Sequence, residues 1–163
     1  MGYSLSINHY ICGKETSFSE FAGMVAEAGI DLVGVTRAAL LEMGVPALAQ
    51  CLKDNGLGVS SLNSSGYFTG TQPENKVHFS DSEMIDIAAE LGAEELTVIS
   101  AGSGDPSKPF AHAYDLVKSG LAEMAPLAEA KGVILGLEPI HPNEIVARGC
   151  INTIAHGLEL VKP

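Results

Sequence analysis

The sequence predicts an α/β fold in which short strands and amphipathic helices alternate along a single domain. Three observations support this prediction. Apolar runs of strand length recur between segments with helical periodicity. Two helical segments open with the spacing of a capping box, and a length of 163 residues suits one domain. Four of the helical segments are followed by a glycine, namely Gly29, Gly56, Gly92 and Gly132, as helix C-termini often are.

Five strands are predicted from short runs of strand-forming residues. The first alternates apolar and polar side chains, and most of the others are nearly continuous apolar runs, as expected for strands covered on both faces. The third strand is expected to end in a polar, glycine-containing stretch at residues 63–75. The predicted strands are residues 3–8, 32–35, 58–62, 96–99 and 133–138.

Five helices are predicted between and after these strands. Ser17 and Ser80 each precede a glutamate by three residues, so hydroxyl and carboxylate satisfy free backbone amides at a helix start. A break is expected before Pro46, and Pro126 is a candidate for a kink. The predicted helices are residues 17–28, 38–55, 80–91, 110–131 and 151–161.

Strands separated by helices pair in parallel through right-handed crossovers. Two architectures fit five such units: a five-stranded doubly wound sheet, or the first five units of a (βα)₈ barrel. Periodicity does not separate them. Both bind ligands beyond the carboxyl ends of the strands, so the residues that end or follow each strand are the candidates for function. These are residues 8–9, 37, 63–66, 100–105 and 138–141.

Composition excludes several classes of function. The net charge is −11, which repels phosphate backbones and argues against nucleic-acid binding. No apolar run reaches the roughly 18 residues that span a bilayer, and no signal-peptide pattern opens the chain. Cys12, Cys51 and Cys150 are too widely spaced for a metal knuckle or a disulfide framework. We therefore expect a cytoplasmic protein with neither nucleic-acid nor membrane partners.

Glu138 and His141 are the most informative polar residues. Glu138 ends the fifth strand, and a carboxylate at this position can bind a divalent cation or transfer a proton. A structural ion pair on the rim is the alternative. His141 can hydrogen-bond a substrate, act as acid or base, or bind metal, because imidazole titrates near neutrality. It also fits an ordinary loop histidine between two prolines.

His9 and Arg37 follow the first and second strands. Both are candidates for substrate binding, and Arg37 is one of only nine cationic residues, suited to an anionic or hydroxylated ligand. A salt bridge to a nearby carboxylate explains Arg37 equally well, and a loop or packing histidine explains His9.

The stretch Leu-Glu-Pro-Ile-His-Pro at 137–142, with Arg148 and Ile-Asn-Thr-Ile-Ala at 151–155, resembles the sugar phosphate isomerase/epimerase family with the xylose isomerase-like TIM barrel. Other segments agree in the same register, so the resemblance covers essentially the whole chain as a single partial barrel, residues 1–163. The agreeing segments are Thr36-Arg37 before Gly44, residues 55–62 with 66–69, residues 88–93 and residues 98–102.

The resemblance implies a divalent metal, Mn or Mg, held by a glutamate on strand five, an aspartate near strand six, a histidine near strand seven and a glutamate on strand eight. The two glutamates exchange protons with a sugar or sugar phosphate through an enediol. Only Glu138 matches one of these positions, as metal ligand and catalytic group. His141, Arg37 and His9 are expected in the substrate pocket.

The chain stops where strand six is expected, so the resemblance implies a fragment that is inactive or nearly so by itself. Its open sheet edges then invite self-association or a partner chain. Two further functions compete with this interpretation. One is a non-catalytic doubly wound binding domain, and the other is a partner chain that completes a split barrel. A sequential strand order favours the barrel, whereas an order of 2-1-3-4-5 favours the doubly wound sheet.

Overall fold

The computed structural model describes residues 4–13, 15–70 and 79–162. It contains one parallel sheet with the strand order β1-β2-β3-β4-β5. Helices connect the successive strands, which confirms the predicted α/β class. The strands are β1 (Ser6–Asn8), β2 (Leu32–Thr36), β3 (Gly58–Gly66), β4 (Glu95–Ile99) and β5 (Leu135–Glu138).

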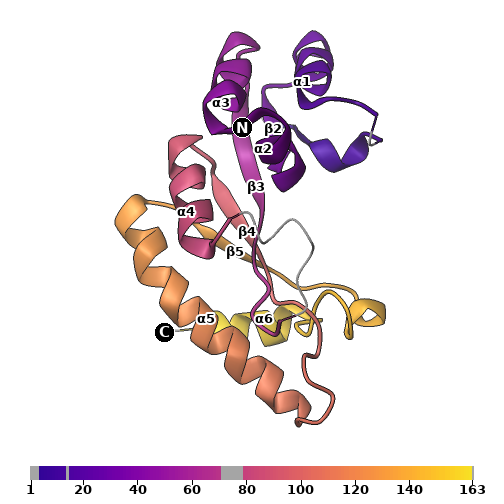
Figure 1. Cartoon of the computed structure of the whole chain (residues 1–163), viewed down its shortest axis with the longest axis vertical. Coiled ribbons are helices and arrows are strands. Elements are labelled where there is room, and N and C mark those ends of the chain that lie inside the picture. The colour runs from indigo at the N-terminus through magenta and orange to yellow at the C-terminus, as the bar shows by residue number, and fades with distance from the viewer. Residues whose placement is uncertain (1–3, 14, 71–78, 163) are drawn as a thin grey trace.

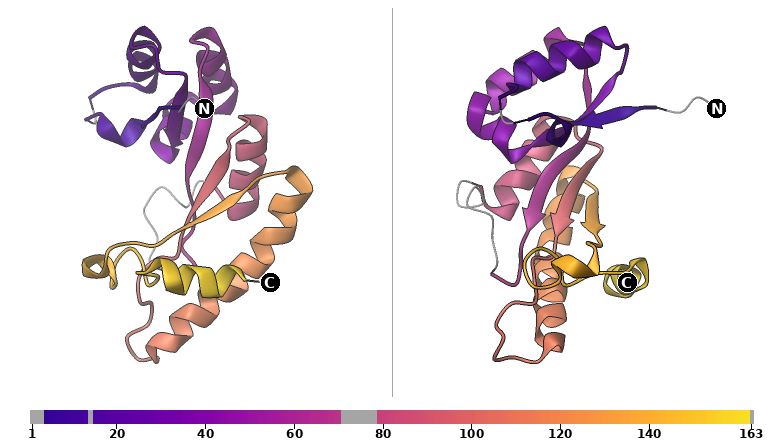
Figure 2. Two further views of the ribbon diagram at one scale, coloured as in Figure 1. Left: turned by 180° about the vertical axis from the view of Figure 1, so that it is seen from behind. Right: turned by 90° about the vertical axis from the view of Figure 1, so that its right-hand side faces the viewer.

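The sequential strand order decides between the two predicted architectures. A doubly wound sheet reverses direction at a switch point, so its strand order cannot follow the chain. Here every strand pairs with the next one in parallel. Figure 2 shows β3, β4 and β5 running side by side in one direction, while β1 crosses that direction in the right-hand view. This twisted, sequential sheet is part of a barrel, and the doubly wound alternative is wrong.

The helices lie in two groups along the sheet. Figure 1 shows α1, α2 and α3 beside β1 and β2, with α5 and α6 at the opposite end of the molecule. No helix among the described residues is both long and apolar enough to cross a membrane. The helices are α1 (Phe18–Glu27), α2 (Arg37–Met43), α3 (Val45–Asp54), α4 (Asp81–Glu90), α5 (Phe110–Lys131) and α6 (Ile154–Val161), with 3₁₀ turns η1 (His9–Ile11) and η3 (Pro142–Glu144).

The predicted break before Pro46 is confirmed, because Gly44 separates α2 from α3 with a φ of 72°. Pro126 lies inside the continuous helix α5. The predicted third strand is too short, since β3 continues to Gly66. The hydroxyl of Ser65 and the amide of Gly66 both donate to Asp81 at the start of α4, so helix α4 supplies the acceptor for the last two residues of the strand. The rest of the expected loop, residues 71–75, lies outside the described residues.

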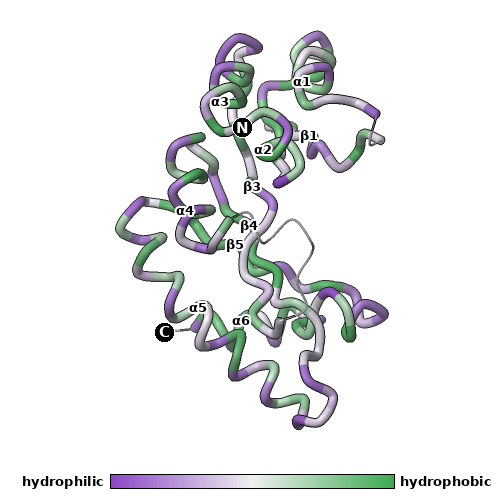
Figure 3. The backbone as a smooth tube through the Cα atoms, in the orientation of Figure 1, coloured by the Kyte–Doolittle hydropathy of each residue, from purple (hydrophilic) through white to green (hydrophobic). Residues whose placement is uncertain are grey.

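The main core lies between the sheet and its helices. Phe18, Phe21, Leu62 and Leu96 are almost fully buried in it. Along α5, hydrophilic and hydrophobic residues are interspersed within each turn (Figure 3), as expected for a helix with one face on the sheet. A smaller cluster of Ala113, Val117, Cys150 and Ile151 joins α5 to the segment before α6.

Both outer strands have one unpaired edge within the described part of the chain, since β1 pairs only with β2 and β5 only with β4. A groove of about 480 Å³ adjoins β5, lined by apolar side chains such as Leu135, Leu137 and Leu160. Nearby on α6, Leu158 and Val161 are more than half exposed. Apolar surface is therefore open beside the β5 edge.

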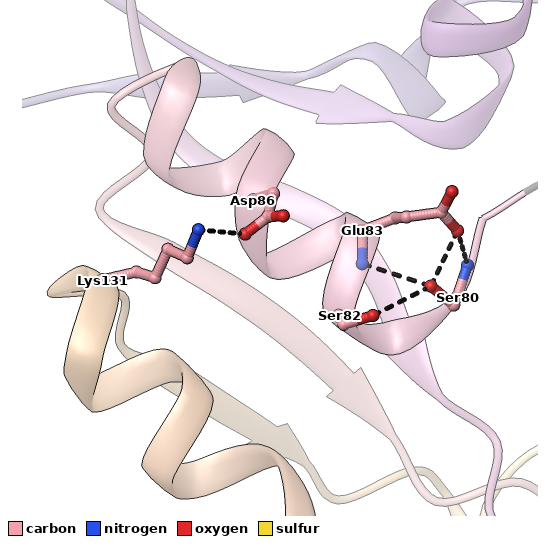
Figure 4. A network of polar contacts seen from close by, with 5 residues as sticks. All are labelled: Ser80, Ser82, Glu83, Asp86 and Lys131. Atoms are coloured by element: carbon pink, nitrogen blue, oxygen red, sulfur yellow. Dashed lines mark hydrogen bonds and ion pairs between the residues drawn. The ribbon is translucent and has the colours of Figure 1, made fainter.

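The start of α4 is held by a complete capping box (Figure 4). The Glu83 amide donates to the Ser80 hydroxyl, and the Ser80 amide donates to the Glu83 carboxylate at 2.7 Å. The Ser80 hydroxyl also donates to this carboxylate at 2.7 Å, and the bonds from the Ser80 amide and hydroxyl lower the pKa of Glu83. On the next turn Asp86 pairs with Lys131 of α5 at 2.6 Å. The box and the ion pair set how α4 begins and how it meets α5.

Replacing Ser80 by alanine is expected to cost about 1 kcal/mol of unfolding free energy, because it leaves helix amides without acceptors. It also removes a cause of the lowered Glu83 pKa. A lowered folded-state pKa stabilises the fold above the unfolded-state pKa, and this contribution is lost as pH falls through the folded-state value. Urea titrations at neutral and acid pH measure both effects. Ser119→Ala, at an exposed position inside α5, is the control, and an equal loss in both variants would contradict the prediction.

Candidate functional site

The strand order brings all the predicted site residues to one edge of the sheet. The strands are parallel and sequential, so their carboxyl ends lie on the same side. We call this side the carboxyl edge; it is defined by the last strand residues, Asn8, Thr36, Gly66, Ile99 and Glu138. His9, Arg37 and His141 follow these ends, as expected from the sequence.

Glu138 is the last residue of β5 and pairs in register with Ile99 of β4. Its side chain is exposed, so the carboxylate is open to a ligand. His141 is also exposed and caps the turn η3, where its Nδ1 accepts a hydrogen bond from the Asn143 amide at 3.2 Å. That bond leaves Nε2 as the ring nitrogen that can carry the proton or meet a ligand.

The loop after Glu138 is hydrogen-bonded to the two residues that follow β4. The Cys150 amide donates to the Ala101 carbonyl at 2.7 Å, and the Ser100 hydroxyl accepts from the Cys150 and Ile151 amides at 3.1 and 3.4 Å. Ser100, Ala101 and Cys150 are fully buried, and burial raises the pKa of the Cys150 thiol. These contacts hold the segment that carries Glu138 and His141 in a defined place beside β4.

His9 lies against the core of the first unit. Its ring meets Phe18 edge-on, with centroids 5.2 Å apart, and lies 5.0 Å from Phe21. Its Nδ1 is 3.3 Å from the Thr36 hydroxyl at the end of β2. The ring is half-buried, so the structure gives His9 a packing role and leaves its predicted substrate contact as a prediction.

Arg37 is buried at the carboxyl edge and is only 2% exposed. Its Nε donates to the Ser64 carbonyl at 2.6 Å, and its Nη1 lies 3.5 Å from the Phe79 carbonyl. Burial lowers the pKa of the guanidinium, opposed by Tyr67, Asp81 and Tyr10. Nothing in these contacts tests substrate binding by Arg37, which stays a prediction.

Two tyrosines at the carboxyl edge were missed by the sequence reasoning. Tyr10 lies in the turn η1 and is 67% exposed. Tyr67 follows β3, and its hydroxyl is hydrogen-bonded to that of Ser64. Tyr10 adjoins His9 in sequence, which is a usable signal. Tyr67 fell in a stretch predicted as a loop, so no signal singled it out.

The described residues alone do not provide the group of side chains that a metal ion needs as ligands. Within residues 4–13, 15–70 and 79–162, no three His, Cys, Asp or Glu side chains are grouped so that they could hold an ion. Among these residues Glu138 therefore does not belong to a complete set of metal ligands.

Comparison with known proteins agrees with the fold. The model of the family described as "Xylose isomerase-like TIM barrel" matches residues 23–163. The solved structure of protein SMc04130 from Sinorhizobium meliloti 1021 is similar, with 28% identity and a TM-score of 0.85. A D-psicose 3-epimerase shares 20% identity with a TM-score of 0.69, and the 3-keto-D-glucoside 4-epimerase YcjR from E. coli shares 17% with 0.72. The last two likenesses show the fold alone.

The matched structures are longer than this chain. Each comparison covers 96% of the chain but only 58% of the Sinorhizobium protein, 58% of the D-psicose 3-epimerase and 62% of YcjR. Among curated protein sequences none matches this chain. The family is therefore supported by the family model and by solved structures.

Proposed function

The chain belongs to the xylose isomerase-like TIM barrel family, and we propose that it forms part of the active site of a sugar or sugar-phosphate isomerase or epimerase. The observation that carries this proposal is the open carboxylate of Glu138 at the carboxyl edge, where β5 ends and a loop hydrogen-bonded to Ser100 begins. The epimerases among the structural neighbours act on sugars, which supports a polyhydroxylated substrate here.

Glu138 acts as the proton-transfer group. Its carboxylate takes the proton from the carbon beside the sugar carbonyl; the freed electron pair forms the C=C bond of an enediolate as the carbonyl electrons move to oxygen. The hydroxyl proton on the deprotonated carbon then moves to the former carbonyl oxygen, and Glu138 returns its proton to the former carbonyl carbon, which interconverts aldose and ketose. Inversion of a centre instead requires a proton delivered to the opposite face, and hence a second acid or base.

The cofactor of the proposed enzyme is Mn²⁺ or Mg²⁺, of which Glu138 is one ligand. The described residues do not complete such a site, so no step of the reaction is assigned to the ion. His141 and His9 bind the sugar from the ends of β5 and β1, and Arg37 contributes at the end of β2. The chain alone is accordingly inactive or nearly so.

A second candidate, favoured by the groove beside β5, is a partner chain that completes a split barrel. The unpaired β5 edge and the exposed apolar side chains of α6 suit either another polypeptide or a second copy of this chain. Sedimentation across a range of concentrations separates the two, since only self-association appears with the purified chain.

The experiment that tests the function measures a half-reaction that one carboxylate can perform. D-fructose is incubated with the protein and Mn²⁺ or Mg²⁺ in D₂O, and mass spectrometry follows deuterium uptake at carbon next to the carbonyl. Slow uptake without net isomerisation is expected from the unaltered chain, because Glu138 can remove the proton but the described residues do not complete the metal site that would stabilise the enediolate.

Glu138→Gln is expected to abolish this uptake, since an amide does not accept the proton. Glu159→Gln, which changes an exposed carboxylate on α6, is the matched control and is expected to leave it intact. Equal uptake in Glu138→Gln and the unaltered chain would disprove the assignment. Rapid net isomerisation by the unaltered chain would instead refute the proposed inactivity.

A further inference from the structure

Arg37 differs from the other candidate residues because its guanidinium is enclosed by protein. It is 2% exposed, and its Nε donates to the Ser64 carbonyl at 2.6 Å. The Phe79 carbonyl lies 3.5 Å from Nη1, and the Phe79 ring lies 5.9 Å from the guanidinium carbon. A buried guanidinium needs such acceptors, because the charge is costly to desolvate. Arg37, the first residue of α2, therefore joins the start of that helix to the end of β3 and to the residue before the α4 capping box.

Ser64 connects Arg37 to a second side chain at the carboxyl edge, that of Tyr67. Its carbonyl accepts from Arg37, while its hydroxyl is hydrogen-bonded to the hydroxyl of Tyr67. The Tyr67 amide donates to the Ile99 carbonyl at 2.6 Å, so both ends of this tyrosine are held. Ser64 thus links the Arg37 guanidinium to the Tyr67 phenol, through one hydrogen bond to its carbonyl and another to its hydroxyl.

The Tyr67 phenol lies on the same side of the sheet as Glu138. Tyr67 follows β3 directly, and its amide donates to the carbonyl of Ile99, which pairs in register with Glu138. A half-buried phenol in this place can donate to or accept from a sugar hydroxyl.

We propose that Arg37 is a positioning residue, which holds Ser64 and through it fixes the Tyr67 hydroxyl at the carboxyl edge for contact with a substrate hydroxyl. The contact with substrate rests on the proposed function. The hold on Tyr67 does not, and it is testable in the protein without substrate.

The test uses NMR of protein labelled with ¹³C at the ring Cζ of tyrosine. The chain has only four tyrosines, so each resonance can be assigned by replacement with phenylalanine. Arg37→Met keeps the apolar stem but removes the donors. Ser64→Ala keeps the carbonyl that Arg37 uses and removes only the hydroxyl that meets Tyr67. Lys53→Met, which removes an exposed cation on α3, is the control.

Both Ser64→Ala and Arg37→Met are expected to shift the Tyr67 resonance in the same direction, with the Arg37 variant reaching at least half the shift of the Ser64 variant. Tyr114, on α5, is expected to stay in place in both, which shows that the fold is intact. A Tyr67 resonance unchanged in folded Arg37→Met would overturn the proposal. If Arg37→Met does not fold, Arg37→Lys replaces it, with a Tyr67 shift expected because an ammonium does not reproduce the planar fork.

D-fructose added to the unaltered protein separates this proposal from the proposed function. A Tyr67 shift on addition of the sugar, with affinity weakened roughly fivefold to tenfold in Tyr67→Phe, is expected for one lost hydrogen bond. No response to sugar in any variant would count against the proposed function. In that case the shift in Arg37→Met would still establish that Arg37 holds Tyr67.

Discussion

Replacing Gly102 by alanine is expected to destabilise the protein by about 3 kcal/mol, because the new methyl group has no room. A Cβ at this position would lie 1.8 Å from the Val146 carbonyl oxygen and 2.8 Å from the Ala147 amide nitrogen. These neighbours are backbone atoms and cannot rotate away. On the other side, the Gly102 carbonyl accepts from the Thr69 hydroxyl at 2.8 Å, which resists movement of Gly102 itself.

Urea unfolding followed by circular dichroism measures this loss. Gly23→Ala is the matched control: nothing lies within 4 Å of a Cβ at Gly23, and its place inside α1 makes alanine stabilising by about 0.5–1 kcal/mol. Opposite signs for the two variants are therefore expected. A Gly102→Ala variant as stable as the unaltered protein would mean that the loop after β5 is not packed on Gly102.

Replacing Phe18 by alanine is expected to cost about 3–5 kcal/mol, the range for a large aromatic side chain removed from a core. Phe18 is 0% exposed, and its ring packs against His9 and Phe21 with centroids 5.2 and 5.7 Å away. The substitution also removes one of the two phenylalanine rings against which the His9 ring packs. Since the Phe18 amide lies 3.3 Å from the Glu42 carboxylate, the backbone of α1 stays anchored.

The unfolding free energy from chemical denaturation checks this prediction, and the ¹H NMR resonance of the His9 ring reports the local change. Phe110→Ala is the control, because Phe110 is 37% exposed and contacts mainly Tyr114 in its own helix. It is expected to cost well under half as much. Equal losses of unfolding free energy in Phe18→Ala and Phe110→Ala would contradict the prediction, because they would show that the core closes around the missing Phe18 ring at no cost.

Most of the fold could be predicted because its signals are local. Capping boxes at Ser17 and Ser80 depend on residues three apart in the chain, and a glycine ends α5 at Gly132 with a φ of 69°. The end of β3 could not be predicted in this way. Ser65 and Gly66 stay in the strand because Asp81, fifteen and more residues away, accepts their hydrogen bonds.

The candidate site was predictable only in part. Glu138 was found from its place at a strand end, which a sequence pattern reveals. Tyr67 was not, because its bonds to Ser64 and Ile99 depend on the register between strands and on the path of the chain after β3. For Arg37 the sequence indicated a charge near the site, and the contact with the Ser64 carbonyl came only from the structure.

The alternation of strands and helices, the strand end at Glu138 with His141 three residues beyond it, and the acidic charge that argues against nucleic acid are all readable from the amino-acid sequence. The sequence left the strand order open, since periodicity is the same in a doubly wound sheet and in a barrel. The tertiary structure decided that order. It also decided which polar groups are buried, because hydrogen bonds such as that from Arg37 to Ser64 join residues 27 positions apart that only packing brings together.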